Sequence, residues 1–175
     1  EFLKSRPETP VLVTYQVPEQ ALGPGWAWDD YNFSFSAERS PFPVYGNVVS
    51  FSLSPGNSLL VDPPFFKKNL ETNITSNLSR VKRELTKNSF EIPISETSAI
   101  KKIVPFITSA HLPAQLLSDT LHRKIHVAQN FGKDLKLERK FYSHPIDTLY
   151  KKILQDSDNF LAEQLLLMAA GEISD

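Results

Sequence analysis

The 175-residue sequence contains no cysteine, which excludes disulfide bonds, a cysteine nucleophile and cysteine-ligated zinc. It also has no marked excess of charge, because 19 lysine and arginine residues stand against 20 aspartate and glutamate residues. A nucleic-acid-binding surface needs a surplus of basic side chains, so this balance gives no reason to expect a nucleic-acid partner. The absence of cysteine does not indicate in which cellular compartment the protein works.

Two further absences concern membranes and the chain ends. No apolar run is long enough to span a bilayer, and no signal peptide is visible at Glu1. The chain begins without a methionine and stops at Asp175, soon after a strongly apolar segment. We therefore interpret the sequence as a piece of a larger protein.

The clearest periodic pattern lies near the C-terminus. Between Pro145 and Gln155, apolar side chains recur at helical spacing on one face. These residues are Ile146, Leu149, Tyr150, Ile153 and Leu154. Residues 160–170 are apolar almost all round, as in a buried helix. The sequence therefore predicts two helices with buried faces, joined by a tight turn that presents residues 157–159, and this helical part is expected to pack on something absent from the chain.

The rest of the chain predicts an α+β module, mostly antiparallel sheet with one main helix. Strands are expected where apolar residues alternate or form short β-rich runs, at 11–17, 47–53, 59–61, 90–94, 103–106 and 125–127. Pro93 predicts that its strand lies at a sheet edge. The helix is expected over residues 112–125, with leucines on one face. The expected division is a β-rich α+β part at 1–140 and a helical part at 141–175.

Residues 21–30 are rich in glycine, proline and tryptophan and predict an ordered loop. Trp26 and Trp28 either anchor this loop to a neighbouring surface or simply belong to the core. Asp29 and Asp30 follow them, and the residue types alone fit a solvated turn as well as a binding site.

Ser157-Asp158-Asn159 matches one of the three catalytic elements of the penicillin-interacting serine enzymes, beside Ser-x-x-Lys and Lys-Thr-Gly. The alternative is that Ser157 and Asn159 only cap the second helix, because both residue types favour that position. Ser-x-x-Lys occurs at Ser79 and Ser98. The chemistry needs this serine at a helix start, and both matches lie in β-leaning sequence, so neither is assigned as nucleophile. Lys-Thr-Gly is absent.

The surroundings of the tripeptide resemble the D-alanyl-D-alanine carboxypeptidase/endopeptidase family, the class C low-molecular-mass penicillin-binding proteins. That family has Ser-x-Pro-Leu, a helix, Ser-Asp-Asn, then Ala-Glu and a leucine pair. Residues 143–146 read Ser-His-Pro-Ile, and residues 162–166 read Ala-Glu-Gln-Leu-Leu. Residues 25–30 read Gly-Trp-Ala-Trp-Asp-Asp, similar to a Gly-Trp-x-Trp-Asp-Asp segment in the family's inserted domain.

The resemblance implies a fragment of a serine D,D-peptidase. Residues 1–140 would be the inserted domain, and residues 141–175 part of a β-lactamase/transpeptidase-like catalytic domain. The parent would be periplasmic or cell-wall associated. It would act through an acyl-enzyme on D-alanyl-D-alanine ends or cross-links of peptidoglycan stem peptides, with β-lactams as inhibitors. No cofactor or metal ion is expected. The chain alone, without the nucleophile and Lys-Thr-Gly, is expected to be inactive.

The resemblance also implies roles for single residues. Ser157 would pass a proton between the catalytic lysine and the leaving amine. Asn159 would hydrogen-bond the substrate backbone and orient the lysine, while Asp158 would brace the turn. Asp30 and Phe35 would line the pocket for the stem peptide's side-chain amine, since a carboxylate beside an aromatic face suits an ammonium group.

The rival interpretation is a non-catalytic cell-wall or protein-interaction module from a degenerate homologue. Ser-x-x-Lys before Glu1 and Lys-Thr-Gly after Asp175 would favour the enzyme, and the absence of both would favour the binding module. A cytoplasmic adaptor is a third, weaker alternative, because it rests only on the missing cysteines and signal peptide.

Overall fold

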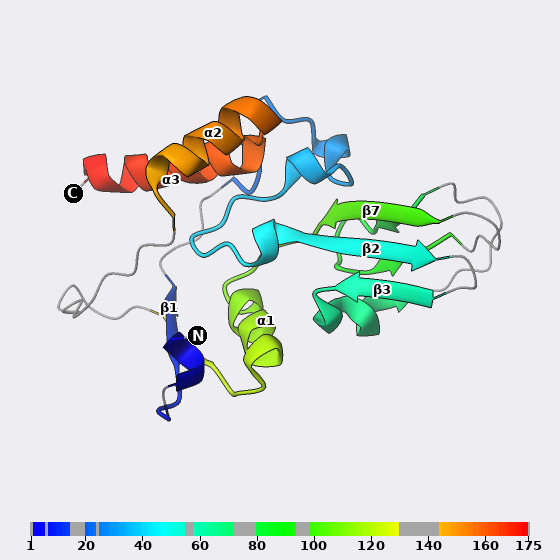
Figure 1. The fold of residues 1–175 in the computed structure, drawn as a ribbon, viewed down its shortest axis with the longest axis horizontal. Coiled ribbons are helices and arrows are strands. Elements are labelled where there is room, and N and C mark those ends of the chain that lie inside the picture. Colours follow the sequence, from blue (N-terminus) through cyan, green and yellow to red (C-terminus); the bar gives the residue numbers. More distant parts are fainter. Residues whose placement is uncertain are drawn as a thin grey trace.

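The computed structural model describes residues 2–5, 7–14, 20–23, 25–54, 58–71, 80–93, 99–129 and 144–174. These residues form strands and helices in a mixed α+β arrangement, which confirms the expected fold class. Figure 1 shows the helices α2 and α3 side by side, with a three-stranded sheet extending away from them. Short 3₁₀ helices occur between these parts: η1 (Phe2–Ser5), η2 (Trp28–Asp30), η3 (Ser34–Ser36), η4 (Tyr45–Asn47) and η5 (Pro64–Asn69).

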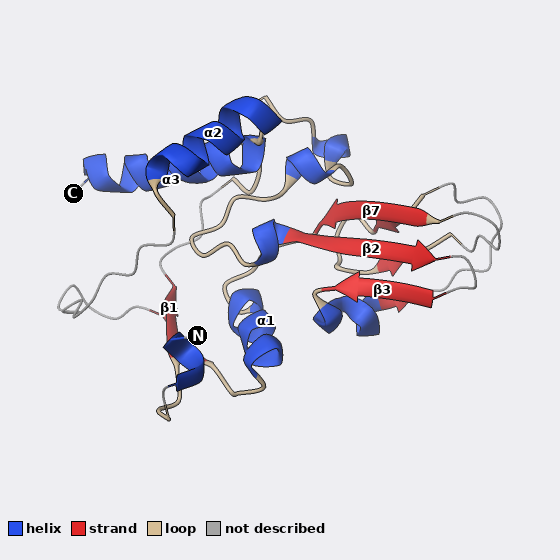
Figure 2. Ribbon diagram, viewed as in Figure 1, coloured by secondary structure: helices blue, strands red, loops and turns tan. Residues whose placement is uncertain are grey.

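The first sheet is antiparallel and has β2 (Val48–Ser54) at its centre, as the labelled strands of Figure 2 show. On either side lie β3 (Ser58–Asp62) and β7 (Ile100–Pro105). Val49 and Phe51 are fully buried and Leu53 is buried, while Ser50 and Ser52 between them are partly exposed. The alternation in the sequence predicted this half-buried strand, and the structure confirms it.

The second sheet is small and has β6 (Phe90–Glu91) at its centre. β4 (Leu70–Glu71) pairs with β6 in parallel, and β5 (Lys82–Arg83) pairs with it antiparallel. The prediction of an edge strand before Pro93 was therefore wrong. Pro93 lies beyond the end of β6, where its missing N–H removes no hydrogen bond from the sheet.

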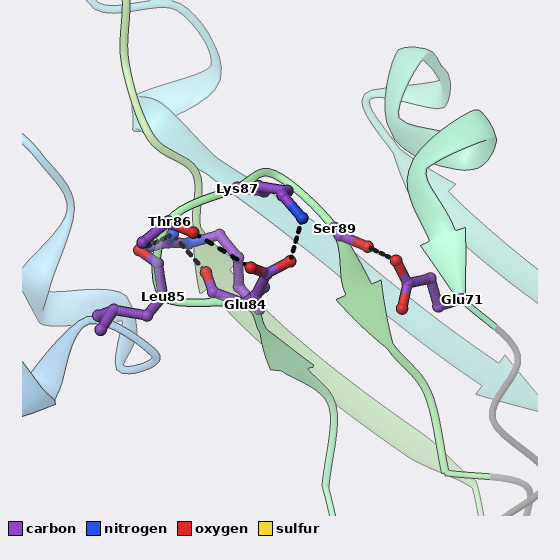
Figure 3. Close-up of polar contacts among 7 residues, drawn as sticks. Glu71, Glu84, Leu85, Thr86, Lys87 and Ser89 are labelled. Atoms are coloured by element: carbon purple, nitrogen blue, oxygen red, sulfur yellow. Dashed lines mark hydrogen bonds and ion pairs between the residues drawn. The ribbon is translucent and has the colours of Figure 1, made fainter.

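The turn between β5 and β6 is held by side-chain contacts at the surface (Figure 3). Glu84 pairs with the ammonium group of Lys87 at 3.4 Å and accepts a hydrogen bond from the Thr86 hydroxyl at 3.1 Å. The Ser89 hydroxyl donates to the Glu71 carboxylate at 2.5 Å, which links this turn to β4. These contacts are exposed, so each stabilises the fold only slightly.

A separate pair of strands, β1 (Val11–Thr14) and β8 (His126–Gln129), runs parallel. The main helix, α1 (Leu112–Leu121), precedes β8 and is shorter than the predicted 112–125. It ends because His122 adopts a left-handed conformation, with φ 51°, and the N–H of Arg123 turns back to the carbonyl of Ser118.

One hydrophobic core joins the two three-stranded sheets and α1. Phe51 of β2 contacts Phe90 of β6 with ring centroids 5.1 Å apart, and Phe66 lies 5.7 Å from Phe90 and 5.1 Å from Phe106. Leu116 of α1 is also fully buried within this cluster. Buried aromatic side chains of this size dominate the stability of a small core.

The C-terminal part is a helical hairpin of α2 (Ile146–Asp156) and α3 (Asn159–Ser174). It matches the two predicted helices, and the apolar stripe of α2 is largely exposed within this chain. Tyr150 is 52% exposed and Leu154 is 80% exposed, because no described residue covers this face. On α3, Leu166 and Met168 are also exposed. Neither helix is long and apolar enough to cross a membrane, nor is any other helix in the described ranges.

Candidate active site

The turn between α2 and α3 carries Ser157, Asp158 and Asn159 as the sequence predicted. Ser157 ends α2 in a left-handed conformation, with φ 52° and ψ 46°. Asp158 accepts a hydrogen bond through Oδ1 from the main-chain N–H of Leu161 at 3.0 Å, and its carbonyl accepts from Ala162. The cap of the second helix is therefore Asp158, not Ser157 or Asn159.

Because Asp158 caps α3, the side chains of Ser157 and Asn159 remain available to a ligand. Ser157 and Asn159 are exposed. Among the residues that the structure describes, neither side chain makes a hydrogen bond. Both line an open cleft of about 330 Å³, together with Phe160 and residues from the β-rich part.

The opposite side of this cleft comes from η3. Ser34 and Phe35 line it, next to Gly46, Val48 and Ile103. η3 contacts both α3 and β7, and Figure 1 shows this segment between the hairpin and the sheet. The structure thus brings Phe35 to the same cleft as Ser157 and Asn159, although more than 120 residues separate them in the sequence.

Asp30, the other predicted pocket residue, lies at the end of η2 and does not line this cleft. Its main-chain carbonyl accepts a hydrogen bond from the N–H of Phe33 at 2.8 Å. The ring of Phe33 stacks on that of Phe35, with centroids 5.5 Å apart and planes 13° apart. Asp30 is therefore connected to the cleft through the turn 30–33 and the stacked pair of phenylalanines.

The tryptophan loop is attached to the sheets by Asn32, three residues beyond Asp29. The Asn32 amide pairs with the main chain of Arg83, accepting from its N–H at 2.7 Å and donating to its carbonyl at 3.4 Å. Trp28 is 71% exposed and Trp26 is half-buried, so neither belongs to the fully buried core.

The guanidinium of Arg83 lies below this loop and is almost fully buried. Its Nε donates to the carbonyl of Pro105 at 2.9 Å, and Nη1 donates to the carbonyl of Glu84 at 2.8 Å. Burial lowers the pKa of the Arg83 guanidinium from its ordinary value, while the Glu38 carboxylate and Tyr31 oppose that shift. The Tyr31 ring also lies 5.1 Å from the guanidinium carbon, so Arg83 connects the loop to both sheets.

One exposed ion pair borders the cleft. Lys152 donates to the Asp156 carboxylate at 2.6 Å, one helical turn further along α2. This hydrogen bond raises the pKa of Lys152 above its ordinary value, and the charge of Asp156 adds to the shift. Because both side chains are more than half exposed, the pair is solvated and contributes little to stability.

The two Ser-x-x-Lys matches remain unsupported as nucleophiles. Ser79 and Ser98 lie outside the described residues, but their lysine partners are placed. Lys82 lies in β5 and Lys101 in β7. Both lysines thus lie on strands, whereas the chemistry requires a lysine one helical turn beyond its serine.

Within the described ranges, no three histidine or acidic side chains come together in a way that could hold a metal ion. His122 and His126 are four residues apart, a spacing that can bind a metal on a helix face. His122 caps the end of α1 and His126 begins β8, so the two do not share a helix face.

The contacts that join the helical hairpin to the β-rich part were not predicted from the sequence. Arg39 pairs with Glu163 of α3, and Gln164 is buried against the main chain of Ser40. No local pattern indicates contacts over 124 residues. The one available signal was a polar pair, Glu163-Gln164, within an otherwise apolar helix.

A sequence profile of the D-Ala-D-Ala carboxypeptidase 3 (S13) family matches residues 14–175, almost the whole chain. The chain belongs to the D-Ala-D-Ala carboxypeptidase 3 family. The family is one of serine peptidases, and the resemblance drawn from residues 143–166 and 25–30 is confirmed at this level.

The solved structures add a match in fold to this family membership. The chain is similar to penicillin binding protein 4 from Haemophilus influenzae, with a TM-score of 0.58 and 17% sequence identity. The match covers 89% of this chain and 40% of that protein. A comparison with curated proteins gave no significant match. This chain thus corresponds to less than half of the solved penicillin-binding protein, within a family whose activity concerns the cell wall.

Proposed function

We propose that the full-length parent is a serine D,D-peptidase that cleaves D-alanyl-D-alanine ends or cross-links of peptidoglycan stem peptides, in the periplasm or at the cell wall. The observation that carries this proposal is the exposed Ser157 and Asn159 on a capped turn, lining one cleft with Phe35. Membership of the D-Ala-D-Ala carboxypeptidase 3 family supports the same reaction class.

In the proposed mechanism, a serine of the parent that is not part of this chain attacks the carbonyl of the penultimate D-alanine. An adjacent lysine takes the serine proton, and the peptide C–N bond breaks to give an acyl-enzyme. Ser157 passes the proton from the lysine to the leaving amine, and water then hydrolyses the acyl-enzyme. The exposed Ser157 hydroxyl suits such a relay because no described group competes for it.

Asn159 and the two residues of the β-rich part bind rather than react in this scheme. The Asn159 amide hydrogen-bonds the substrate backbone and orients the lysine. Phe35 and Asp30 receive the side-chain amine of the stem peptide, the ring by its face and the carboxylate by its charge. Asp30 does not line the cleft, so this role requires the amine to reach past Phe35 towards η2.

The test uses the full-length parent and the 175-residue chain side by side. Labelled penicillin should attach covalently to the parent, which should also release D-alanine from a stem peptide. The isolated chain should do neither, because its sequence contains no Lys-Thr-Gly and both of its Ser-x-x-Lys matches lie in β-leaning sequence. A parent that binds stem peptide without acylation would support the rival binding module, and label retained on the isolated chain at Ser79 or Ser98 would contradict the assignment of roles.

A further inference from the structure

The contact between Arg39 and Glu163 joins the β-rich part to α3 through a largely buried ion pair. The Nη1 atom of Arg39 lies 3.3 Å from the Glu163 carboxylate, and the two side chains are only 11% and 17% exposed. Nη2 of Arg39 also donates to the carbonyl of Gln20 at 2.9 Å, and the Arg39 N–H donates to Ala21. A charge pair this buried holds its geometry, since each ion left alone would be poorly solvated.

Gly23 lies directly opposite the carboxyl group of Glu163. A Cβ atom at Gly23 would lie 2.6 Å from the Glu163 carboxyl group, which is too close for any side chain to fit without displacement. A side chain at position 23 would therefore displace the Glu163 carboxylate, which pairs with Arg39.

The next residues of both segments make a second buried contact. The Gln164 amide, in the orientation that satisfies both groups, donates to the Ser40 carbonyl at 2.9 Å and accepts from the Ser40 N–H at 3.1 Å. The Ser40 hydroxyl lies 2.9 Å from the amide nitrogen of Asn47, which also donates to the carbonyl of Glu38 at 2.8 Å. Ser40 thus hydrogen-bonds with Asn47 on its own segment and with Gln164 of α3.

Both contacts lie close to the cleft in the sequence, about one helical turn after Asn159 on α3 and four or five residues after Phe35 on the other segment. Phe35 lines the cleft and Arg39 follows it by four residues, while Asn159 lines the cleft and Glu163 follows it by four residues. The pairs 39–163 and 40–164 therefore join the two segments that carry Phe35 and Asn159 close to the cleft. Both are side-chain contacts between α3 and the β-rich part.

We propose that Arg39, Ser40, Glu163 and Gln164 form a clamp whose role is to position the peptide-binding side of the cleft against the Ser157–Asn159 side. This inference rests on the proposed function, and it makes the four residues positioning residues for substrate selection. A stem peptide must reach both sides of the cleft at once. Penicillin needs only the side that carries Ser157 and Asn159, so the clamp favours the peptide.

The experiment compares Glu163→Gln and Arg39→Gln with the parent, using two rates. The first is kcat/KM for a stem peptide with a free side-chain amine, and the second is the rate of penicillin acylation. A displacement of the cleft wall by about 1 Å should lower the peptide rate roughly 10- to 100-fold, mainly through KM. Penicillin acylation should fall no more than about threefold.

Two further variants keep the result interpretable. The double variant Arg39→Met/Glu163→Leu removes both charges together, and so avoids the unpaired buried ion that can unfold a single variant. It should show the same selective loss for the peptide. Lys87→Gln is the matched control, because it removes an ion pair in the distant turn after β5, and it should leave both rates within twofold.

Each outcome decides the proposal. A selective loss for the peptide in the variants that keep a native melting temperature supports the clamp. Equal losses in both rates, or an unchanged peptide rate in the double variant, would overturn the clamp while leaving the D,D-peptidase proposal intact. A parent that neither reacts with penicillin nor hydrolyses the peptide would overturn the proposed function, and the clamp's role in selection with it.

Discussion

The carboxylate of Asp158 caps α3 by accepting a hydrogen bond from the N–H of Leu161 at 3.0 Å. The middle residue of the Ser-Asp-Asn turn is thus the structural one, and the residues beside it are free to face the cleft. Stability and catalysis should therefore separate within three consecutive residues.

Replacing Asp158 by alanine should lower the free energy of unfolding by about 1 kcal/mol, the usual value of a lost helix cap. Asp158→Asn should cost only a few tenths of a kcal/mol, because asparagine caps as well and loses only the charge at the helix N-terminus. Urea unfolding of the 175-residue chain measures both. Equal losses for alanine and asparagine would mean that the Leu161 hydrogen bond contributes nothing.

Replacing Ser157 in the full-length parent should have the opposite effect. If Ser157 relays a proton, Ser157→Ala should lower penicillin acylation roughly 10²- to 10⁴-fold, as expected for a positioned acid–base group. This corresponds to about 3–5 kcal/mol of barrier. Stability should change by no more than about 1 kcal/mol, the value of a cap, because Asp158 rather than Ser157 holds the turn.

Ser157→Gly is the informative companion to that variant. It removes the same hydroxyl, but glycine accepts the positive φ of this position more easily than alanine does. Acylation should fall as far as in Ser157→Ala, while the melting temperature should be at least as high. Near-normal rates in either variant, or losses that follow unfolding, would make Ser157 a structural residue.

The sequence predicted the elements whose pattern is local. The alternation of Val49 and Phe51 indicated β2, and the apolar helical pattern around residues 157–159 indicated the hairpin. The small sheet was harder to predict, because β4, β5 and β6 have two residues each and show no periodicity. Tertiary pairing, not local preference, makes these segments strands.

The site was predicted only as far as its motifs reach. Ser157, Asn159 and Phe35 were identified from two segments of the sequence, and the structure brings them to one cleft. The clamp was not predicted, because Arg39 and Ser40 carry no motif and their partners lie 124 residues away. A helical pattern indicates which face of α2 is apolar but not what covers it, and within this chain Tyr150 and Leu154 are exposed.

Arg83 should be important for the fold. Its guanidinium donates to the carbonyls of Pro105, Glu84 and Leu85, so Arg83→Met should leave the buried Pro105 carbonyl without this donor. The expected loss is about 2–3 kcal/mol of the free energy of unfolding. Urea unfolding of the 175-residue chain measures it, with Arg80→Met as the control at an exposed position. Similar stability in both variants would show that the buried guanidinium is replaceable.

Asp30 and Phe35 give the last prediction, which concerns recognition of the side-chain amine. Asp30→Ala should lower kcat/KM for a stem peptide with a free amine roughly 10- to 100-fold, because a charge-assisted hydrogen bond contributes about 1.5–3 kcal/mol. Phe35→Ala should cost less, on the order of 0.5–1 kcal/mol, the range of an exposed cation–π contact. The same peptide with its amine acetylated should be hydrolysed at nearly equal rates by Asp30→Ala and the parent, since it carries no charge to recognise. Asp29→Ala is the matched control, being the exposed neighbouring acid on η2. Because Asp30 does not line the cleft, equal rates for Asp30→Ala and Asp29→Ala on the free-amine peptide would mean that the amine never reaches η2, and the recognition role would then fall to Phe35 alone.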